Sequence, residues 1–276
     1  MVLKIIITLF LMLLGTTKAS AQIVGESEPN NTKDMAQLIQ ATKETAIQAA
    51  TGSRTDQYVV MGSTSMKDID WYKVYLSKGT QYVDCNDNDF NFWVYDEMDN
   101  NILYQSYTKA PFGSRVYPFE AYYSGYYYIK VQGTNSVSQN YKLGVGDHTY
   151  ALAHCKIKFG SIKMSNKKDY VQEFNLSENN DIPKGTLVYE MVLNGVLSTR
   201  ATGAIIDNIS QSSKMSLVLP IYKLSNISNK GLDLKSHWKI TIGYKKDSTI
   251  NPELFLYFVY PVTSEFLPSD EIIINI

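Results

Sequence analysis

The stretch that decides the fold is Gly125-Tyr126-Tyr127-Tyr128-Ile129-Lys130-Val131, a short run dense in large side chains. Successive side chains of a strand point to opposite faces of its sheet. One face would carry Tyr127, Ile129 and Val131, and the other would carry Tyr126, Tyr128 and Lys130. We therefore expect a β-strand here, with neighbours that repeat the pattern.

Further short runs of this kind precede it in the first half of the chain. They are Tyr58 to Met61, Trp71 to Leu76, Gln81 to Cys85, Phe90 to Tyr95 and Ile102 to Tyr107. Turn-rich clusters at 96–101 and 133–140 separate such runs. This spacing predicts an antiparallel sandwich rather than βαβ units. One short helix is expected over Thr32 to Ile39, with Thr32 as its cap and Ala36 and Leu38 facing inward.

A second series of strands begins near Tyr150. Asn194-Gly195, between 186–193 and 196–200, predicts a two-residue hairpin turn. Further strands are expected at 202–206, 216–222, 238–244 and 254–259. The predicted fold class is all-β, with two antiparallel, jelly-roll-like β-sandwich domains in tandem after a signal peptide. The predicted bounds are 1–21 for the signal peptide, 22–148 for the first domain and 149–276 for the second.

The first residues have the pattern of an export signal. Lys4 precedes the apolar run Ile5 to Leu14, and Ala19-Ser20-Ala21 fits a signal-peptidase site. Ten apolar residues are about half of a bilayer-spanning helix. A retained membrane anchor is the alternative. We expect a secreted, extracellular protein that has no membrane contact after cleavage.

Composition excludes some classes of function. The chain has 276 residues, of which 26 are basic and 27 acidic, so its net charge is −1. It therefore lacks the basic field that a dedicated nucleic-acid binder needs. Apolar residues make up 44%, which argues against intrinsic disorder.

Oxygen-bearing side chains cluster in two separate segments. Glu26, Glu28, Asn30 and Asn31 lie in the first, and Asp68 and Asp70 lie in the second, just before an expected strand. Six or more hard oxygen ligands in a flexible cage suit calcium better than magnesium. The alternative is that these acids are solvated surface charges.

Residues 26–145 resemble the bacterial pre-peptidase C-terminal (PPC) domain, which is also the collagen-binding module of clostridial collagenases. The motifs that carry the resemblance are Glu28-Pro29-Asn30-Asn31-Thr32, Asp68-Ile69-Asp70-Trp71-Tyr72, Phe92-Trp93-Val94-Tyr95-Asp96 and the Gly125 run. The resemblance implies a β-sandwich in which Glu26, Glu28, Asn30, Asn31, Asp68 and Asp70 share a Ca²⁺ ion. Asn31 departs from the aspartate often found there, which weakens the expected binding.

Recognisable catalytic motifs are missing. The chain has no His-Glu-x-x-His and no Gly-x-Ser-x-Gly sequence, so we expect no enzyme activity. His154 and Cys155 would point to opposite faces of one strand and would not form a catalytic pair. Cys85 and Cys155 are either two buried free thiols or an inter-domain disulfide. The acidic run 84–89 lacks the glycine and the final glutamate of an EF-hand, and is interpreted as a polar loop.

Tyr126, Tyr128 and Lys130 have two interpretations. They either pack across strands on a solvated face or form an aromatic platform for a collagen-like peptide or a glycan. The sequence thus favours a secreted, non-catalytic accessory module that binds an extracellular matrix protein or a surface polymer. One alternative is a structural or chaperone-like partner of a secreted peptidase, and a weaker one is a carbohydrate-active or other enzyme with an unrecognised site.

Overall fold

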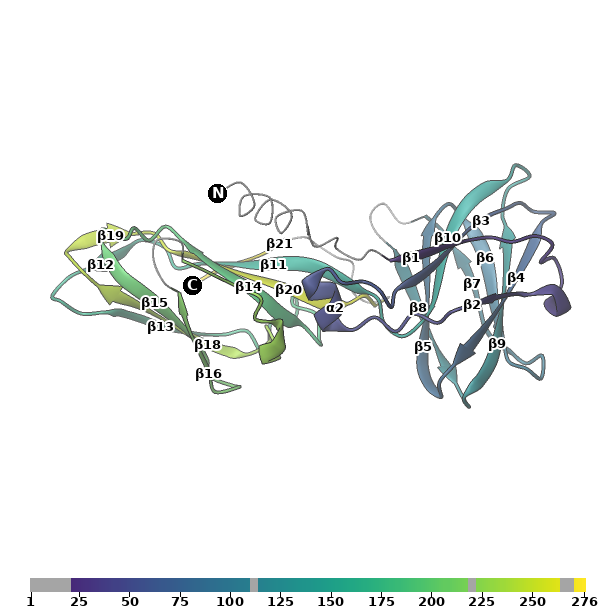
Figure 1. Cartoon of the computed structure of the whole chain (residues 1–276). Coiled ribbons are helices and arrows are strands. Elements are labelled where there is room, and N and C mark those ends of the chain that lie inside the picture. The colour runs from purple at the N-terminus through teal and green to yellow at the C-terminus, as the bar shows by residue number, and fades with distance from the viewer. Residues whose placement is uncertain (1–20, 110–113, 218–221, 264–270) are drawn as a thin grey trace, which may run out of the picture.

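The chain forms two β-sandwiches that lie end to end (Figure 1). The computed structural model describes residues 21–109, 114–217, 222–263 and 271–276. The predicted signal peptide therefore lies outside the described residues, except for Ala21. Within the described ranges, no helix is both long and apolar enough to cross a membrane.

Two five-stranded sheets form the first sandwich, in the orders β1-β3-β10-β5-β8 and β2-β4-β9-β6-β7. Pairing is antiparallel except between β1 and β3 and between β2 and β4. The strands of the first sheet are β1 Gln22–Gly25, β3 Tyr58–Thr64, β5 Gly79–Asp87, β8 Arg115–Ala121 and β10 Gln139–Gly146. Those of the second are β2 Gln37–Ile39, β4 Ile69–Leu76, β6 Phe90–Tyr95, β7 Asn101–Tyr107 and β9 Gly125–Gly133.

The second sandwich packs a sheet of order β17-β14-β20-β11-β21 against one of order β13-β18-β15-β16, with the pair β12-β19 beside them. The first sheet consists of β11 Tyr150–Lys158, β14 Leu187–Asn194, β17 Lys223–Ser225, β20 Glu253–Pro261 and β21 Glu271–Asn275. The remaining strands are β12 Ile162–Met164, β13 Tyr170–Asn175, β15 Ala201–Asn208, β16 Ser213–Leu217, β18 His237–Tyr244 and β19 Ser248–Ile250. A 3-10 turn, η2, spans Ser228–Lys230. The predicted all-β fold class is confirmed.

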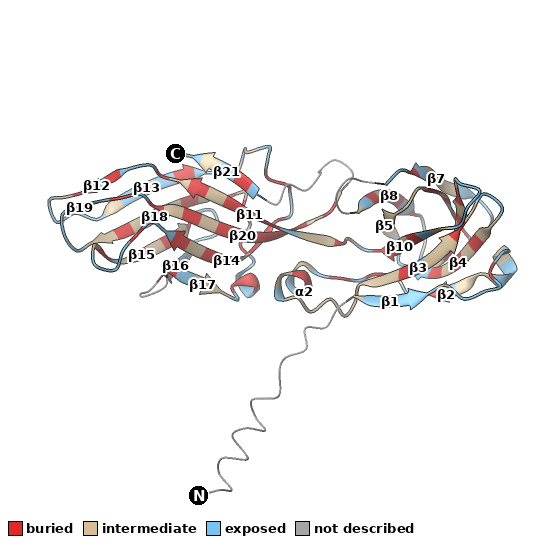
Figure 2. Cartoon of the chain, turned by 90° about the horizontal axis from the view of Figure 1, so that it is seen from above, coloured by how far each residue is buried: buried red, intermediate tan, exposed pale blue. Residues whose placement is uncertain are grey.

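Each sandwich has its own core, built by the period-two pattern of its strands (Figure 2). On β9, Tyr127, Ile129 and Val131 are fully buried while their neighbours are only partly covered. Cys85 lies in the first core and Cys155 in the second, and both are free thiols. Burial raises the pKa of both thiols, so each behaves as a small apolar side chain.

Two local predictions were wrong. Residues 32–39 form a 3-10 turn, η1 Lys33–Met35, followed by β2, and Leu38 is 65% exposed. Pairing of β2 with β4 and burial of Ile39 outweigh the local helix pattern. The Asn194-Gly195 hairpin is also absent, because β14 and β15 belong to different sheets and residues 196–200 form no strand. Gly195 has φ 74° where a Cβ would meet the Asn251 carbonyl, so it serves a close chain crossing instead.

One segment of the first sandwich packs on the second. Between β2 and β3 the chain forms helix α2, Ala46–Thr51, which Figure 1 places between the sandwiches. The helix begins with a capping box, Thr45 with Gln48, and ends at Gly52 in the left-handed conformation. Ala49 is buried in a small cluster with Leu187 of β14 and Val259 of β20.

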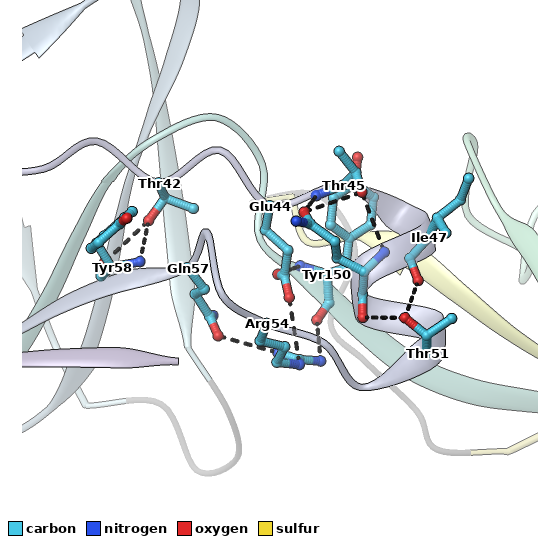
Figure 3. Close-up of polar contacts among 10 residues, drawn as sticks. Thr42, Glu44, Thr45, Ile47, Thr51, Arg54, Gln57, Tyr58 and Tyr150 are labelled. Atoms are coloured by element: carbon cyan, nitrogen blue, oxygen red, sulfur yellow. Dashed lines mark hydrogen bonds and ion pairs between the residues drawn. The ribbon is translucent and has the colours of Figure 1, made fainter. Parts of the chain in front are cut away.

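Polar contacts hold the segment that carries α2, residues 42–58, in place (Figure 3). This segment is called here the excursion. Thr42 and Tyr58 tie its base through Thr42 Oγ1, which donates to Tyr58 O and accepts from Tyr58 N, at 3.1 and 3.2 Å. Across the junction, Arg54 Nη2 donates to Tyr150 O at 3.2 Å. Within the segment itself, Arg54 Nε lies 3.5 Å from Glu44 Oε1. The side chain of Glu44 is fully buried, so Arg54 is the counter-charge that makes its burial tolerable.

Candidate functional site

The segment that carries Glu26 to Asn31 bridges the two sheets of the first sandwich. Glu26 N donates to Met61 O on β3 at 2.9 Å, and Trp71 N on β4 donates to Asn30 O at 2.9 Å. Glu26 Oε2 also accepts from Ser63 N at 2.9 Å. Because β3 and β4 lie in different sheets, the segment fixes its acidic side chains at the edge where the sheets meet.

Three carboxylates converge at this edge. Glu26, Glu28 and Asp70 each place an oxygen within 4.8 Å of the others. At that separation and an effective dielectric of about 20, two full negative charges repel by roughly 3 kcal/mol. Ionising all three groups is therefore costly unless a proton or a cation lies among them.

This convergence changes the pKa of Asp70, one of the three carboxylates. Its side chain is fully buried at the start of β4. Burial, together with the nearby charge of Glu26, raises the pKa of Asp70 to about 8, although a hydrogen bond from Tyr141 lowers it. At neutral pH the cation-free site therefore favours a proton on Asp70.

Two tyrosine hydroxyls and one amide connect these acids. Tyr141 on β10 donates to Asp70 Oδ2 at 2.9 Å, and Tyr72 on β4 donates to Glu26 Oε1 at 3.2 Å. The two hydroxyls also contact each other. Asn30 is fully buried, and its backbone N–H donates to Glu28 Oε2 at 2.8 Å. The amide and the hydroxyls orient the carboxylates but leave their charge uncompensated.

Two buried oxygens at this site accept no hydrogen bond from the described residues. They are Asn30 Oδ1 and Asp70 Oδ1. A buried acceptor without a partner costs about 1–3 kcal/mol, so its persistence points to an absent partner such as an ion or water. Hard oxygen donors of this kind, three of them carboxylates, match the ligand preference of a divalent cation.

Asn31 and Asp68 pair with each other beside this group. With the Asn31 amide oriented for hydrogen bonding, its nitrogen donates to Ile69 O at 3.0 Å and to Asp68 Oδ1 at 3.2 Å. Asp68 contributes, as the smallest of several causes, to the raised pKa of Asp70. The six predicted ligands thus divide into Glu26, Glu28, Asn30 and Asp70 at the centre and an Asn31–Asp68 pair at its side; their role stays a prediction.

Tyr72, Tyr141 and Gly62 were not predicted as site residues. Tyr72 lies within the second acidic motif, whereas β10, which carries Tyr141, was not expected as a strand at all. A Cβ on Gly62 would lie 2.4 Å from the Tyr141 hydroxyl, so this glycine makes room for Tyr141. The alternation of Tyr141, Leu143 and Val145 was the available signal for β10.

The second candidate site is the outward face of the sheet β2-β4-β9-β6-β7, called here the aromatic face. Register places its side chains in rows across neighbouring strands. The aromatic face consists of Trp71, Lys73 and Tyr75 on β4, Tyr126, Tyr128 and Lys130 on β9, Trp93 and Tyr95 on β6, and Tyr104 on β7. The three residues predicted for polymer binding lie at its centre, and their role stays a prediction.

Ring contacts make this face continuous. Centroids are 5.0 Å apart for Trp93 and Tyr104, and 5.5 Å apart for Trp71 and Tyr95. Lys130 Nζ lies 4.4 Å from the centre of the Trp93 ring. Two of the chain's three tryptophans, Trp71 and Trp93, therefore lie half-buried on one sheet face rather than in a core.

Comparisons with known proteins bear on the fold alone. No protein-family model and no curated protein match the chain. Among solved structures, a protein of Eubacterium rectale described as a "putative secreted protein" is similar, with 12% identity, a TM-score of 0.52 and coverage of 88% of each chain. The pre-peptidase C-terminal domain of a Bacillus anthracis collagenase matches at 18% identity and a TM-score of 0.30, over 44% of this chain and 99% of its own. The first likeness supports the two-sandwich arrangement over most of the chain.

Proposed function

We propose that the protein is a secreted, non-catalytic binding module whose first sandwich is stabilised by calcium and binds an extended extracellular polymer. The observation that carries the proposal is the aromatic face, which spans four adjacent strands. Strands lie about 4.8 Å apart, so the rows of rings extend over roughly 14 Å. That width suits a long, thin ligand better than a small molecule.

Side-chain chemistry supports binding rather than packing as the role of this face. Tyr75 and Tyr104 are 54% and 51% exposed, although each lies against another ring. Aromatic side chains supply large contact area at low conformational cost and are enriched at binding hot spots. A solvated face would not require nine large side chains in register.

Calcium is the cation that best fits the site at the sheet edge. Carboxylate and amide oxygens from a flexible loop suit its variable coordination, whereas magnesium demands near-ideal octahedral geometry and keeps its waters. Bound calcium would replace the proton that Asp70 otherwise favours and would join residues 26–31 to β4. The resemblance of residues 26–145 to PPC domains supports both this role and an extracellular location. The pattern of a signal peptide at 1–21 supports the location.

A polymer pull-down tests the proposal. Purified protein with calcium is incubated with insoluble collagen and with bacterial cell-wall glycan, and Trp93→Ala is compared with Tyr257→Ala. Tyr257 is a matched control because it is a partly buried outer-face aromatic of the second sandwich. We expect retention on one polymer and at least a tenfold loss for Trp93→Ala, about 1.4 kcal/mol or more.

Two outcomes would overturn the proposal. One is retention on neither polymer while a peptidase co-purifies from culture supernatant, which would favour the chaperone-like alternative. The other is equal retention of Trp93→Ala and the parent protein. The melting temperature of each variant checks that lost retention is not lost folding.

A further inference from the structure

The charges of the aromatic face indicate what kind of polymer it accepts. Lys73 Nζ lies 4.2 Å from the centre of the Tyr126 ring and 5.4 Å from that of Tyr128. Lys130 is held in the same way over Trp93. Among the residues that the structure describes, neither ammonium group has an acidic partner within ion-pair distance.

Four lysines on other strands contrast with these two. Ion pairs join Lys142 to Asp87, Lys156 to Glu253, Lys223 to Glu190 and Lys239 to Asp207. Each of those lysines is balanced by an acid of the same sheet. Lys73 and Lys130 instead present their charge on a surface of aromatic rings.

Three acids near the aromatic face already have an ion-pair or hydrogen-bond partner. Asp99 pairs with Lys33, whose Nζ also lies 4.2 Å from the centre of the Tyr128 ring. Asp96 is buried and accepts from the backbone of Met98 and Asn100, while Glu97 accepts from Tyr126 N at 3.3 Å. A hydrogen bond from an amide does not cancel a carboxylate charge, but among the described residues no acid lies within ion-pair distance of Lys73 or Lys130.

We infer that the polymer is an anionic polysaccharide, whose sugar rings stack on the tryptophan and tyrosine rings and whose carboxylates pair with Lys73 and Lys130. This inference rests on the proposed function and names the ligand class. Sugar rings combine an apolar C–H face with a polar rim, which matches a surface of amphipathic rings. A lysine already placed over a ring needs little reorganisation to meet a carboxylate beside a stacked sugar.

An extended peptide fits this face less well. Peptides often bind by adding a strand to an exposed sheet edge, where backbone N–H and C=O groups are available. Here β4, β9 and β6 each pair with strands on both sides, so their backbone groups are used within the sheet. The edge strand β7 carries only Tyr104 of the face, so across the other three strands recognition comes from side chains, which are rings and cations.

A pocket lies at one end of the aromatic face, where it would bind one end of the polymer. It has a volume of about 500 Å³, which is in the range of ligand sites, and Tyr75 and Tyr126 belong to both the pocket and the face. Tyr58, Lys43 and Asp56 line its other side. Gln48 donates a hydrogen bond to the Asp56 carboxylate, and the pocket thus carries one basic and one acidic side chain, Lys43 and Asp56.

Titration calorimetry on the full, calcium-loaded protein tests the inference. The probes are alginate and polygalacturonate oligosaccharides, with dextran oligosaccharides as neutral controls. The variant Lys73→Gln/Lys130→Gln is compared with the matched Lys142→Gln/Lys156→Gln, which alters lysines that have acidic partners. We expect binding of at least one acidic probe, at least tenfold weakening by the first variant and by 500 mM NaCl, and less than a twofold effect of the second.

The outcomes separate this inference from the proposed function. Equal affinity for dextran, or unchanged affinity in Lys73→Gln/Lys130→Gln, overturns the inference but leaves the proposed function intact if Trp93→Ala still abolishes polymer retention. Retention on collagen with no binding of either acidic probe also overturns it. Absence of binding to every polymer, acidic, neutral or protein, overturns both.

Discussion

Asp70 is a single residue that makes the stability of the first sandwich depend on pH. Its pKa is raised to about 8 by burial and by Glu26, so the folded, cation-free protein holds a proton that the unfolded chain releases near pH 4. Stability from that proton is complete below about pH 4 and is lost as pH rises towards 8. A divalent cation would supply the missing positive charge instead.

We therefore predict that chelator-treated protein loses thermal stability between pH 5 and pH 8, and that calcium restores it mainly at pH 8. Calcium at ten times its dissociation constant stabilises by about 1.4 kcal/mol, or roughly 3–6 °C in the melting temperature. Differential scanning fluorimetry with and without chelator at both pH values measures this. In Asp70→Asn the loss of stability between pH 5 and pH 8 should become smaller, although Asp84, whose pKa burial raises to about 6, still contributes to it. The effect of calcium should also shrink, whereas Asp181→Asn, at an exposed position of the second sandwich, should resemble the parent. Superimposable curves in chelator and calcium at pH 8 would contradict the cation site.

At this scale the sequence located the two acidic segments but not their geometry. The resemblance predicted that the two segments would meet, and Glu26 and Glu28 do lie beside Asp70. It could not predict that Asn31 and Asp68 would pair at the side, because that depends on how the loop enters the sandwich. Tyr141 lies 71 residues after Asp70, and only the register of β10 brings the two together.

Helix α2 is the element that most changes the expected domain organisation. Its capping box and its glycine C-cap are local signals that can be recognised in Thr45 to Gly52. Where the helix packs is not local information, since its contacts with Leu187 and Val259 join residues more than one hundred positions apart. The prediction of a hairpin at Asn194-Gly195 was wrong for a related reason. The residues of a turn do not determine which sheet the next strand joins.

Enlarging Ala49 should separate the two sandwiches. Ala49 is 2% exposed between α2 and the β14–β20 surface, so Ala49→Leu forces extra volume into a packed contact and costs about 1–3 kcal/mol. We expect a lower melting temperature and two resolved unfolding transitions in place of one. Ile47→Leu, at a 50% exposed position of the same helix, is the control and should change little. A single unchanged transition in Ala49→Leu would show that the contact does not couple the sandwiches.

At the scale of the whole molecule, one buried ion pair lies at the contact between the two sandwiches. Glu44 is buried at the junction, where desolvation raises its pKa and Arg54 lowers it. The sequence predicted two sandwiches, but the charge pair between them could not be foreseen. Glu44 and Arg54 are ten positions apart and meet only because α2 returns the chain.

Removing Arg54 should loosen the junction more as pH rises. In Arg54→Met the Glu44 carboxyl keeps its burial without a counter-charge, so its pKa rises further and ionisation near neutral pH destabilises the contact by about 3–5 kcal/mol. We expect a broader distribution of inter-sandwich distances in small-angle scattering at pH 8 than at pH 5. The double variant Glu44→Gln/Arg54→Met should recover the compact distribution, because no buried charge remains. Identical scattering of the Arg54→Met variant and the parent at both pH values would refute this role.

The excursion that carries α2 has a mechanical consequence. Two tandem modules that are joined by one linker can rotate about that single connection. A force on one module is then transmitted poorly to the other. Here the chain passes between the sandwiches three times, out after Thr42, back before Tyr58 and out again at residues 146–150. Torsion applied through a polymer held on the first sandwich would therefore be resisted at two places: the covalent connection at 146–150 and the non-covalent contact of α2 with β14 and β20.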